Sequence, residues 1–194
     1  MKKYLTLLVA CILLFNLIQA QDTLKNSVYF GYGRGSSPMF GIIAGSVVTT
    51  MVTFGVYMGP TTVKTTGIIN LGYQHLLSKR FSIGGTYSFE KITCGWDANS
   101  TFDYQSFSDN IHTIMASMRI KYTLNKPVEL YGRMDLGYQW YTQSNPSDYI
   151  VEFSNFGFQF TPFGLSFGQA FRGFFEFGFG NLGLINFGIN YNFK

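Results

Sequence analysis

The two histidines are the first candidates for acid–base chemistry. His112 has Ser108 and Asp109 close by in the sequence, and a nucleophilic site needs a hydroxyl, a base and an acid within hydrogen-bond reach of one another. No motif ensures that these three side chains meet, so we interpret His112 as a structural residue. His75 lies near a predicted short turn. The sequence shows no phosphate-binding loop, metal cluster or nucleophile elbow, and we expect no catalytic residue, no cofactor and no metal.

Charged residues in the central part of the chain fall on one side of a period-two alternation. Those that we assign to one network are Arg80, Glu90, Arg119, Lys121, Glu129, Arg133, Asp135 and Glu176, and Lys64 has the same parity. The near balance of positive and negative charge predicts a packed salt-bridge network inside the fold. The alternative is a path or gate for ions, but ion-pair networks also arise without any activity.

Segment 93–110 combines acidic and aromatic side chains, which could bind a cation, a glycan or a host surface. They are Asp97, Asp103, Asp109, Trp96, Phe102, Tyr104 and Phe107. The spacing is not that of a calcium loop, so we expect a solvated loop with aromatics at a membrane interface. Cys94 is interpreted as an incidental loop cysteine.

Long period-two alternation predicts the elements that would position these residues. In 128–141, apolar Leu130, Met134 and Trp140 alternate with polar or charged side chains. Strands are expected at about 26–34, 61–76, 80–92, 111–124, 128–142, 150–168, 173–180 and 183–193. Short connections at 77–80, 124–127 and 169–172 alternate with longer segments, as in bacterial barrels. Pro162 breaks the parity of the sixth strand and predicts a bulge.

The composition favours strands that face lipid. Hydrophobic residues make up 46% of the 194 residues, aromatic residues 19% and charged residues only 12%, whereas soluble domains carry about 25% charged residues. A Lys or Arg facing lipid at the bilayer midplane costs ~2–4 kcal/mol, so a bilayer would enforce the observed segregation of charge. The net charge of +4, lower still without Lys2 and Lys3, is too weak to indicate nucleic acid binding.

The first twenty residues have the three parts of an export signal. Lys2 and Lys3 form a basic start, Tyr4 to Ile18 is mostly apolar, and Ala20 offers a small residue for cleavage before Gln21. We expect residues 1–20 to be removed and 21–194 to form one barrel domain. A lipoprotein-type cleavage at Cys11 is the less favoured alternative.

The segment between Arg34 and Lys64 has no charge and predicts a short amphipathic helix in the first extracellular loop. Ser37 and Pro38 suit the N-cap and first turn, and Gly55 suits the end. The expected apolar face consists of Phe40, Ile43, Ala44, Val47, Val48, Met51 and Val52, opposite Gly45, Ser46, Thr49, Thr50 and Thr53. This helix would lie on the barrel mouth or at the lipid interface. A transmembrane helix, or an extra hairpin giving ten strands, is the alternative.

The last residues resemble the C-terminal signal of outer-membrane barrels. A polar residue, a Gly two positions on and alternating aromatic positions ending in Phe are present as Asn186, Gly188, Tyr191 and Phe193, followed by Lys194. The resemblance implies recognition by the barrel-assembly machinery. Over residues 26–194 the chain resembles the small OmpA/OmpX-like outer-membrane β-barrel family, including Bacteroides-type barrel proteins.

The sequence therefore predicts an all-β fold, a transmembrane antiparallel up-and-down barrel of eight strands. We expect a monomer in the outer membrane, surrounded by lipid, with a structural or surface-interaction role through extracellular loops whose ligand or host partner is unknown. Because the interior of an eight-stranded barrel is just filled by side chains, a narrow channel is a weaker hypothesis. A lipid-modifying enzyme acting on lipid A through His112 is the runner-up.

Overall fold

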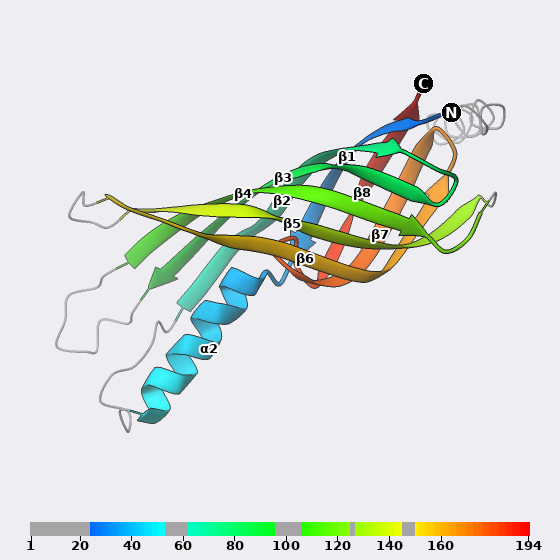
Figure 1. Ribbon diagram of the computed structural model, residues 1–194. Helices are drawn as coiled ribbons and strands as arrows, with labels where there is room; N and C mark the ends of the chain where they lie inside the picture. Colours follow the sequence, from blue (N-terminus) through cyan, green and yellow to red (C-terminus); the bar gives the residue numbers. More distant parts are fainter. Residues whose placement is uncertain (1–23, 53–61, 96–105, 125–126, 145–149) are drawn as a thin grey trace, which may run out of the picture.

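The protein is an eight-stranded antiparallel β-barrel. The computed structural model describes residues 24–52, 62–95, 106–124, 127–144 and 150–194. Each strand pairs with its neighbour in sequence, and β1 pairs with β8 to close the barrel (Figure 1). The strands are β1 (Asn26–Arg34), β2 (Thr62–Leu76), β3 (Phe81–Gly95), β4 (Ser106–Lys121), β5 (Val128–Ser144), β6 (Ile150–Gly168), β7 (Phe171–Gly180) and β8 (Ile185–Phe193). The prediction of eight strands is confirmed, and the ten-stranded alternative is wrong.

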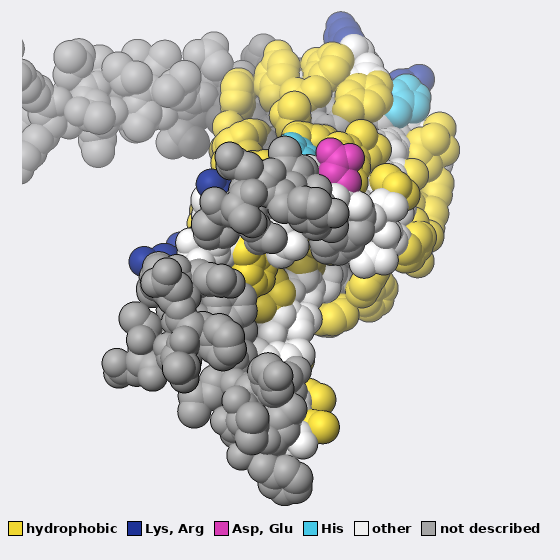
Figure 2. Space-filling view, turned by 90° about the vertical axis from the view of Figure 1, so that its left-hand side faces the viewer, with side chains coloured by type: hydrophobic (Ala, Val, Ile, Leu, Met, Phe, Trp, Pro, Cys, Tyr) yellow, Lys and Arg dark blue, Asp and Glu magenta, His cyan; other side chains and the backbone are white. Residues whose placement is uncertain are grey.

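The alternation of side chains places apolar residues outside and polar residues inside. On β5, Met134 and Leu136 are exposed, whereas Arg133 and Asp135 between them are buried. The same alternation holds on the other strands, and hydrophobic side chains form much of the visible wall when the barrel is viewed from one end (Figure 2). A water-soluble barrel would have the opposite arrangement, because its outer face would need to be polar.

Two bulges change the facing of side chains along a strand. The register of β6 shifts between Phe160 and Phe163, which confirms the predicted bulge at Pro162. A second shift separates Thr65 from Ile68 on β2, where Gly67 has a φ of 76°. A left-handed backbone of this kind favours Gly, because a side chain would clash with the backbone.

Inward tyrosines fill the lumen by lying across glycines of the neighbouring strand. The ring of Tyr29 covers Gly72, and the ring of Tyr131 covers Gly164. A Cβ at either glycine would collide with that ring. Glycine at these positions therefore lets a large side chain lie flat against the wall, which fills the narrow interior.

A helix, α2 (Ser37–Val52), follows β1. Its N-cap is Ser36, one residue earlier than predicted, since the Met39 backbone N–H donates to Ser36 Oγ at 3.2 Å. Met39 and Ile42 pack against the barrel, whereas the predicted apolar face is largely exposed, including Val48 and Met51. The predicted apolar face therefore points away from the barrel, because the mouth accommodates only the first turns. Thr53 and Gly55 lie outside the described residues.

The two ends of the barrel differ. At one end, which we call the turn end, lie the start of β1, the end of β8 and the connections β2–β3, β4–β5 and β6–β7. The other end, from which α2 projects, we call the loop end (Figure 1). Strands β2 to β6 have 15 to 19 residues, but β1, β7 and β8 have only 9 or 10. A five-stranded sheet therefore extends beyond the closed barrel at the loop end.

Candidate functional site

The middle of the lumen contains a cluster of three buried charges, which we call the central ion cluster. Arg133 Nε lies 2.9 Å from Asp135 Oδ2, and Arg133 Nη1 lies 2.9 Å from Glu176 Oε1. All three residues are at most 4% exposed. Arg133 and Asp135 share the inward face of β5, and barrel closure brings Glu176 of β7 to the same height.

Polar side chains from β5 itself and from three other strands, β1, β3 and β8, add hydrogen bonds to this cluster. Tyr131 Oη donates to Glu176 Oε1 at 2.8 Å, and Asn186 Nδ2 donates to Glu176 Oε2 at 2.8 Å. Thr86 Oγ1 donates to Asp135 Oδ1 at 3.1 Å, and Tyr29 Oη bonds to Thr86. Buried charges are tolerated only when they are paired and hydrogen-bonded in this way. The arrangement holds β1, β3, β5, β7 and β8 together across the lumen and leaves it filled.

Closer to the turn end, three cations surround one carboxylate. Arg119 Nη2 lies 3.1 Å from Glu129 Oε1, whereas Lys121 Nζ and Arg172 Nη1 lie 2.9 Å and 3.0 Å from Glu129 Oε2. The Arg119 guanidinium also stacks over the ring of Tyr131, with its carbon 3.3 Å from the ring centroid. We call these four charged residues the basic cluster, since positive charge exceeds negative charge in it by two.

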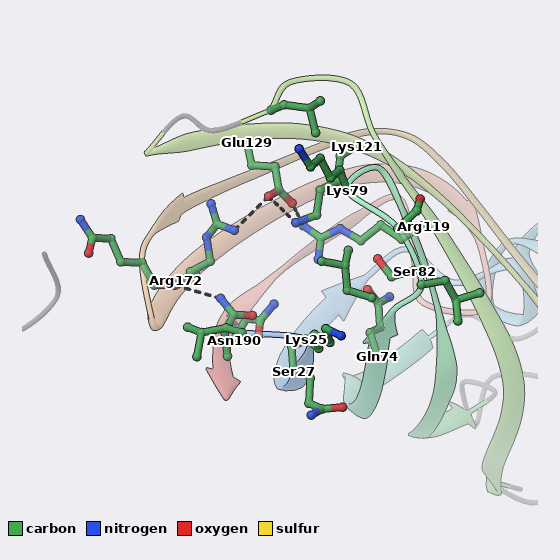
Figure 3. A pocket seen from close by; sticks show the side chains of 18 of the residues that line it. Lys25, Ser27, Gln74, Lys79, Ser82, Arg119, Lys121, Glu129, Arg172 and Asn190 are labelled. Carbon is green, nitrogen blue, oxygen red and sulfur yellow. Dashed lines mark hydrogen bonds and ion pairs between the residues drawn. The ribbon is translucent and has the colours of Figure 1, made fainter. Parts of the chain in front are cut away.

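The basic cluster lines a cavity of about 370 Å³ that opens at the turn end (Figure 3). Two further cations, Lys25 and Lys79, line the same cavity, together with Ser27, Gln74, Ser82 and Asn190. Among the described residues that line the cavity, Glu129 is the one carboxylate. The lining comes from both chain ends and from the turns, so only the closed barrel brings it together.

The structure separates the charged residues that the sequence placed in one network. Six of them divide into the central ion cluster and the basic cluster. Glu90 is buried nearer the loop end and accepts a hydrogen bond from Thr65 Oγ1 at 2.7 Å. Arg80 lies in the β2–β3 turn with an exposed side chain, because β3 begins only at Phe81. It belongs to neither cluster.

The structure places two charged residues differently from what the sequence predicted. Lys64 points outward and is exposed, because the bulge after Thr65 reverses the facing of β2. Arg172, which the sequence analysis assigned to a turn, is the first inward residue of β7 and binds Glu129. Its parity with Glu176 is the signal that could have identified it.

The interior of the loop end contains an apolar group. Ile92, Cys94 and Ile111 are buried there, and Met39 and Ile42 of α2 pack against them. Cys94 is therefore a core residue of β3 and not a loop cysteine. Of the acidic and aromatic residues in segment 93–110, Asp97, Asp103, Trp96, Phe102 and Tyr104 lie outside the described residues. Asp109 points inward and is buried.

His112 is part of an outward aromatic group and does not meet the predicted partners. Its ring stacks on Trp140 at 5.4 Å between centroids, and its Nδ1 lies 2.8 Å from Tyr87 Oη. Asp109 lies on the opposite face of β4. Ser108, four residues away, is about 13 Å distant along the strand at ~3.3 Å per residue. The described structure thus does not assemble the Ser–His–Asp combination.

The residues of the C-terminal motif lie on β8, and their side chains divide between the two faces. Asn186 points inward to Glu176, and Gly188 lies opposite Gly31 of β1. Tyr191 is exposed on the outside and packs against Phe171 and Phe193, with ring centroids 4.9 and 6.1 Å away. Asn186 therefore also contributes to the central ion cluster.

Within the described ranges, no three His, Cys, Asp or Glu side chains are grouped so that they could hold a metal ion. The helical part of the described chain contains no segment both long enough and apolar enough to cross a membrane.

Comparison with known proteins finds similarity among solved structures. No family model matches the sequence, and no curated protein matches it. Two structures of Ail, the attachment invasion locus protein of Yersinia pestis, one of them in complex with the heparin analogue sucrose octasulfate, are similar to this chain. For each, sequence identity is 15%, the match covers 87% of this chain and 97% of Ail, and the TM-score is 0.44.

Proposed function

We propose that this chain is an outer-membrane β-barrel of the small OmpA/OmpX-like type that interacts with other molecules through its loop end. The observation that carries the proposal is the inversion of the fold, which has an apolar outside and a polar, filled inside. Exposed Phe, Ile, Leu, Met and Tyr side chains cover the outer wall. A water-exposed apolar surface of this extent would aggregate, whereas lipid solvates it.

Two outward aromatic groups support a membrane location, and their separation fits a bilayer. His112 stacks with Trp140 toward the loop end, and Tyr122 is exposed at the turn end just after β4. Ten residues of strand at ~3.3 Å each give about 33 Å, or about 25 Å along the barrel axis at a tilt of ~40°. An apolar band of ~25 Å between aromatic girdles is typical of outer-membrane barrels.

Cations begin on the outer wall where the apolar band ends at the loop end. The outward residues of β1 run from Val28 through Phe30 and Tyr32 to exposed Arg34, and those of β3 run from Ile83 to exposed Lys91. Lys64 on β2 is exposed beside them. Cations at this level would meet anionic headgroups of outer-membrane lipid.

The filled lumen favours a surface role over conduction. The central ion cluster crosses the barrel, and the apolar group around Ile92 packs with Met39 and Ile42 of α2 at the loop end. An ion would have to displace buried, paired charges, which is strongly unfavourable. Since Ser108, His112 and Asp109 do not meet, no observation favours the lipid-modifying enzyme.

The extended sheet is the part available to a partner. Pairing of β6 with β7 begins only at Gln159, so that residues 150–157 of β6 pair with β5 alone within the described chain. An unpaired strand edge offers backbone donors and acceptors to another chain. The exposed apolar residues of α2, including Val48 and Met51, lie at the same end. This end therefore suits a surface ligand or a host partner.

Export and assembly complete the proposal. The segment 1–20 would direct secretion and be cleaved after Ala20, and the motif ending in Phe193 would engage the barrel-assembly machinery. N-terminal sequencing of the mature protein from outer-membrane fractions should begin at Gln21. Retention of residues 1–20, or a lipid on Cys11, would contradict the cleavage.

The surface role is tested with cells that carry the full-length protein in the outer membrane. The cells are applied to an array of polysaccharides and extracellular-matrix proteins, alongside cells with a Val48→Lys, Met51→Lys variant. Binding by the parent, and its loss in the variant at equal surface amounts, is the expected result. Binding no stronger than that of cells lacking the protein would contradict a surface-interaction role, and steady ion conductance in planar bilayers would favour the channel instead.

A further inference from the structure

We propose that the cavity at the turn end is a binding site for a small anion that carries phosphate groups. The cavity faces the side of the membrane opposite the loop end, so this activity is separate from the proposed surface role and does not depend on it.

The lining carries a large excess of positive charge. Among the described residues, five cations line the cavity, namely Lys25, Lys79, Arg119, Lys121 and Arg172, and Glu129 is the one carboxylate. The surplus is four positive charges. The nearest other acidic groups in the lumen, Asp135 and Glu176, are already paired with Arg133. Because these two carboxylates share one cation, they offset one of the four surplus charges, and an excess of three remains.

Glu129 alone does not provide enough acceptors for the N–H donors of the cations that it pairs with. Its two oxygens accept ion pairs from three side chains, while each guanidinium has five N–H donors to place. Arg119 is only 7% exposed, and its Nε has no hydrogen-bond partner in the described structure, nor does Nε of Arg172. Cations buried with incomplete compensation are costly, and a bound anion would supply the missing charge.

Neutral polar groups add directional contacts around the cations. The side chains of Gln74, Ser82 and Asn190 border the cavity beside Arg119 and Arg172 (Figure 3). Hydroxyl and amide groups of this kind can donate hydrogen bonds to oxyanions. Asn190 is 4% exposed, and its amide Nδ2 is a donor of this kind. The lining thus resembles a built polar site more than a ring of surface lysines.

Size and charge indicate the class of ligand. A volume of about 370 Å³ lies at the lower end of the ~300–1,000 Å³ usual for small-molecule pockets. Arg binds phosphate through paired N–H groups, and Lys binds it as a point charge. A pyrophosphate-like polyanion matches the surplus of charge better than a single carboxylate. A polymer would not fit inside the closed wall.

Titration calorimetry with inorganic pyrophosphate tests the proposal. The mature chain is folded in a non-ionic glycoside detergent, which contains no phosphate, and compared with Arg172→Gln and Lys79→Gln. We expect one saturable site that weakens about tenfold or more in each variant, because each loses a charged contact. Added salt should weaken it further. The matched control is Arg80→Gln, since Arg80 neighbours Lys79 but does not line the cavity.

A second arm identifies the source of the phosphate. Phosphatidylglycerol is added to the micelles, and its competition with pyrophosphate is measured. If phosphatidylglycerol competes with pyrophosphate, and competes less well in Lys79→Gln, the occupant of the site is a lipid headgroup. If it does not compete, the occupant is a free periplasmic anion.

Folding is checked for every variant by the heat-dependent gel shift of barrels. If Arg172→Gln fails to fold, Lys79→Gln still decides, because Lys79 is exposed at the rim of the cavity. No saturable binding by the parent, or equal binding by Lys79→Gln and Arg80→Gln, would overturn the proposal. Neither result would affect the array test of the surface role.

Discussion

Neighbouring residues on β5 provide a sharp test of the assignment of faces. Met134 is 42% exposed on the outer wall, whereas Arg133 beside it is 4% exposed and paired with two carboxylates. Met134 lies midway between Val128 at the turn end of β5 and Trp140 near the loop end. A side chain at position 134 should therefore meet the hydrocarbon midplane.

The structure supplies the magnitudes of two substitutions. Met134→Arg places a cation opposite Met118 and Phe160, where no carboxylate can compensate it, and should cost ~2–4 kcal/mol. Arg133→Met leaves Asp135 and Glu176 without their cation and should cost ~3–5 kcal/mol, as in other broken buried pairs. Because these ranges overlap, stability alone does not separate the two faces.

Location separates the two faces. A small fluorophore attached to a cysteine at 134, or at 133, is measured in vesicles with and without lipids brominated near the chain centre. Quenching should be strong at 134 and weak at 133. Urea unfolding in the same vesicles gives the costs, with Met134→Leu as a volume-conserving control expected to change stability by less than ~1.5 kcal/mol. Equal quenching at both positions, or the reverse order, would refute an apolar outer wall in contact with lipid.

Three further substitutions test individual parts of the structure. Phe193→Ala should leave less folded barrel in the outer membrane, because it removes the terminal aromatic of the assembly motif; wild-type amounts of heat-modifiable protein would contradict that role. Gly72→Val should lower the free energy of unfolding, measured by urea titration, by ~1–3 kcal/mol or more, because it displaces the Tyr29 ring. The control Gly85→Val should have little effect in the same titration, because a Cβ at Gly85 meets only a backbone oxygen at 3.7 Å. Glu129→Gln should cost up to ~3–5 kcal/mol, because three cations lose their shared carboxylate; a cost no larger than that of the exposed control Glu152→Gln would show that the basic cluster is held by other means.

Local patterns in the sequence determined the strands and their faces. Alternation between neighbouring residues is a property of the extended backbone, so the inward facing of Arg133 and the outward facing of Met134 could be predicted without a partner strand. Pro162 similarly predicted a bulge, because it lacks the backbone N–H that hydrogen bonding between strands requires. The short turns and the apolar outer wall then required an antiparallel barrel.

Contacts across the lumen were decided by the tertiary structure. Arg172 and Glu129 are 43 positions apart, and their meeting depends on how the strands are staggered when the barrel closes, which no local pattern encodes. Lys64 changed face because a single bulge reversed the alternation above Thr65. The orientation of α2 was also decided by the tertiary structure, since the side of the helix that is covered depends on its contact with the barrel mouth. The sequence alone therefore sorts residues into inside and outside, whereas closure of the barrel decides which inward charges pair and where a cavity remains.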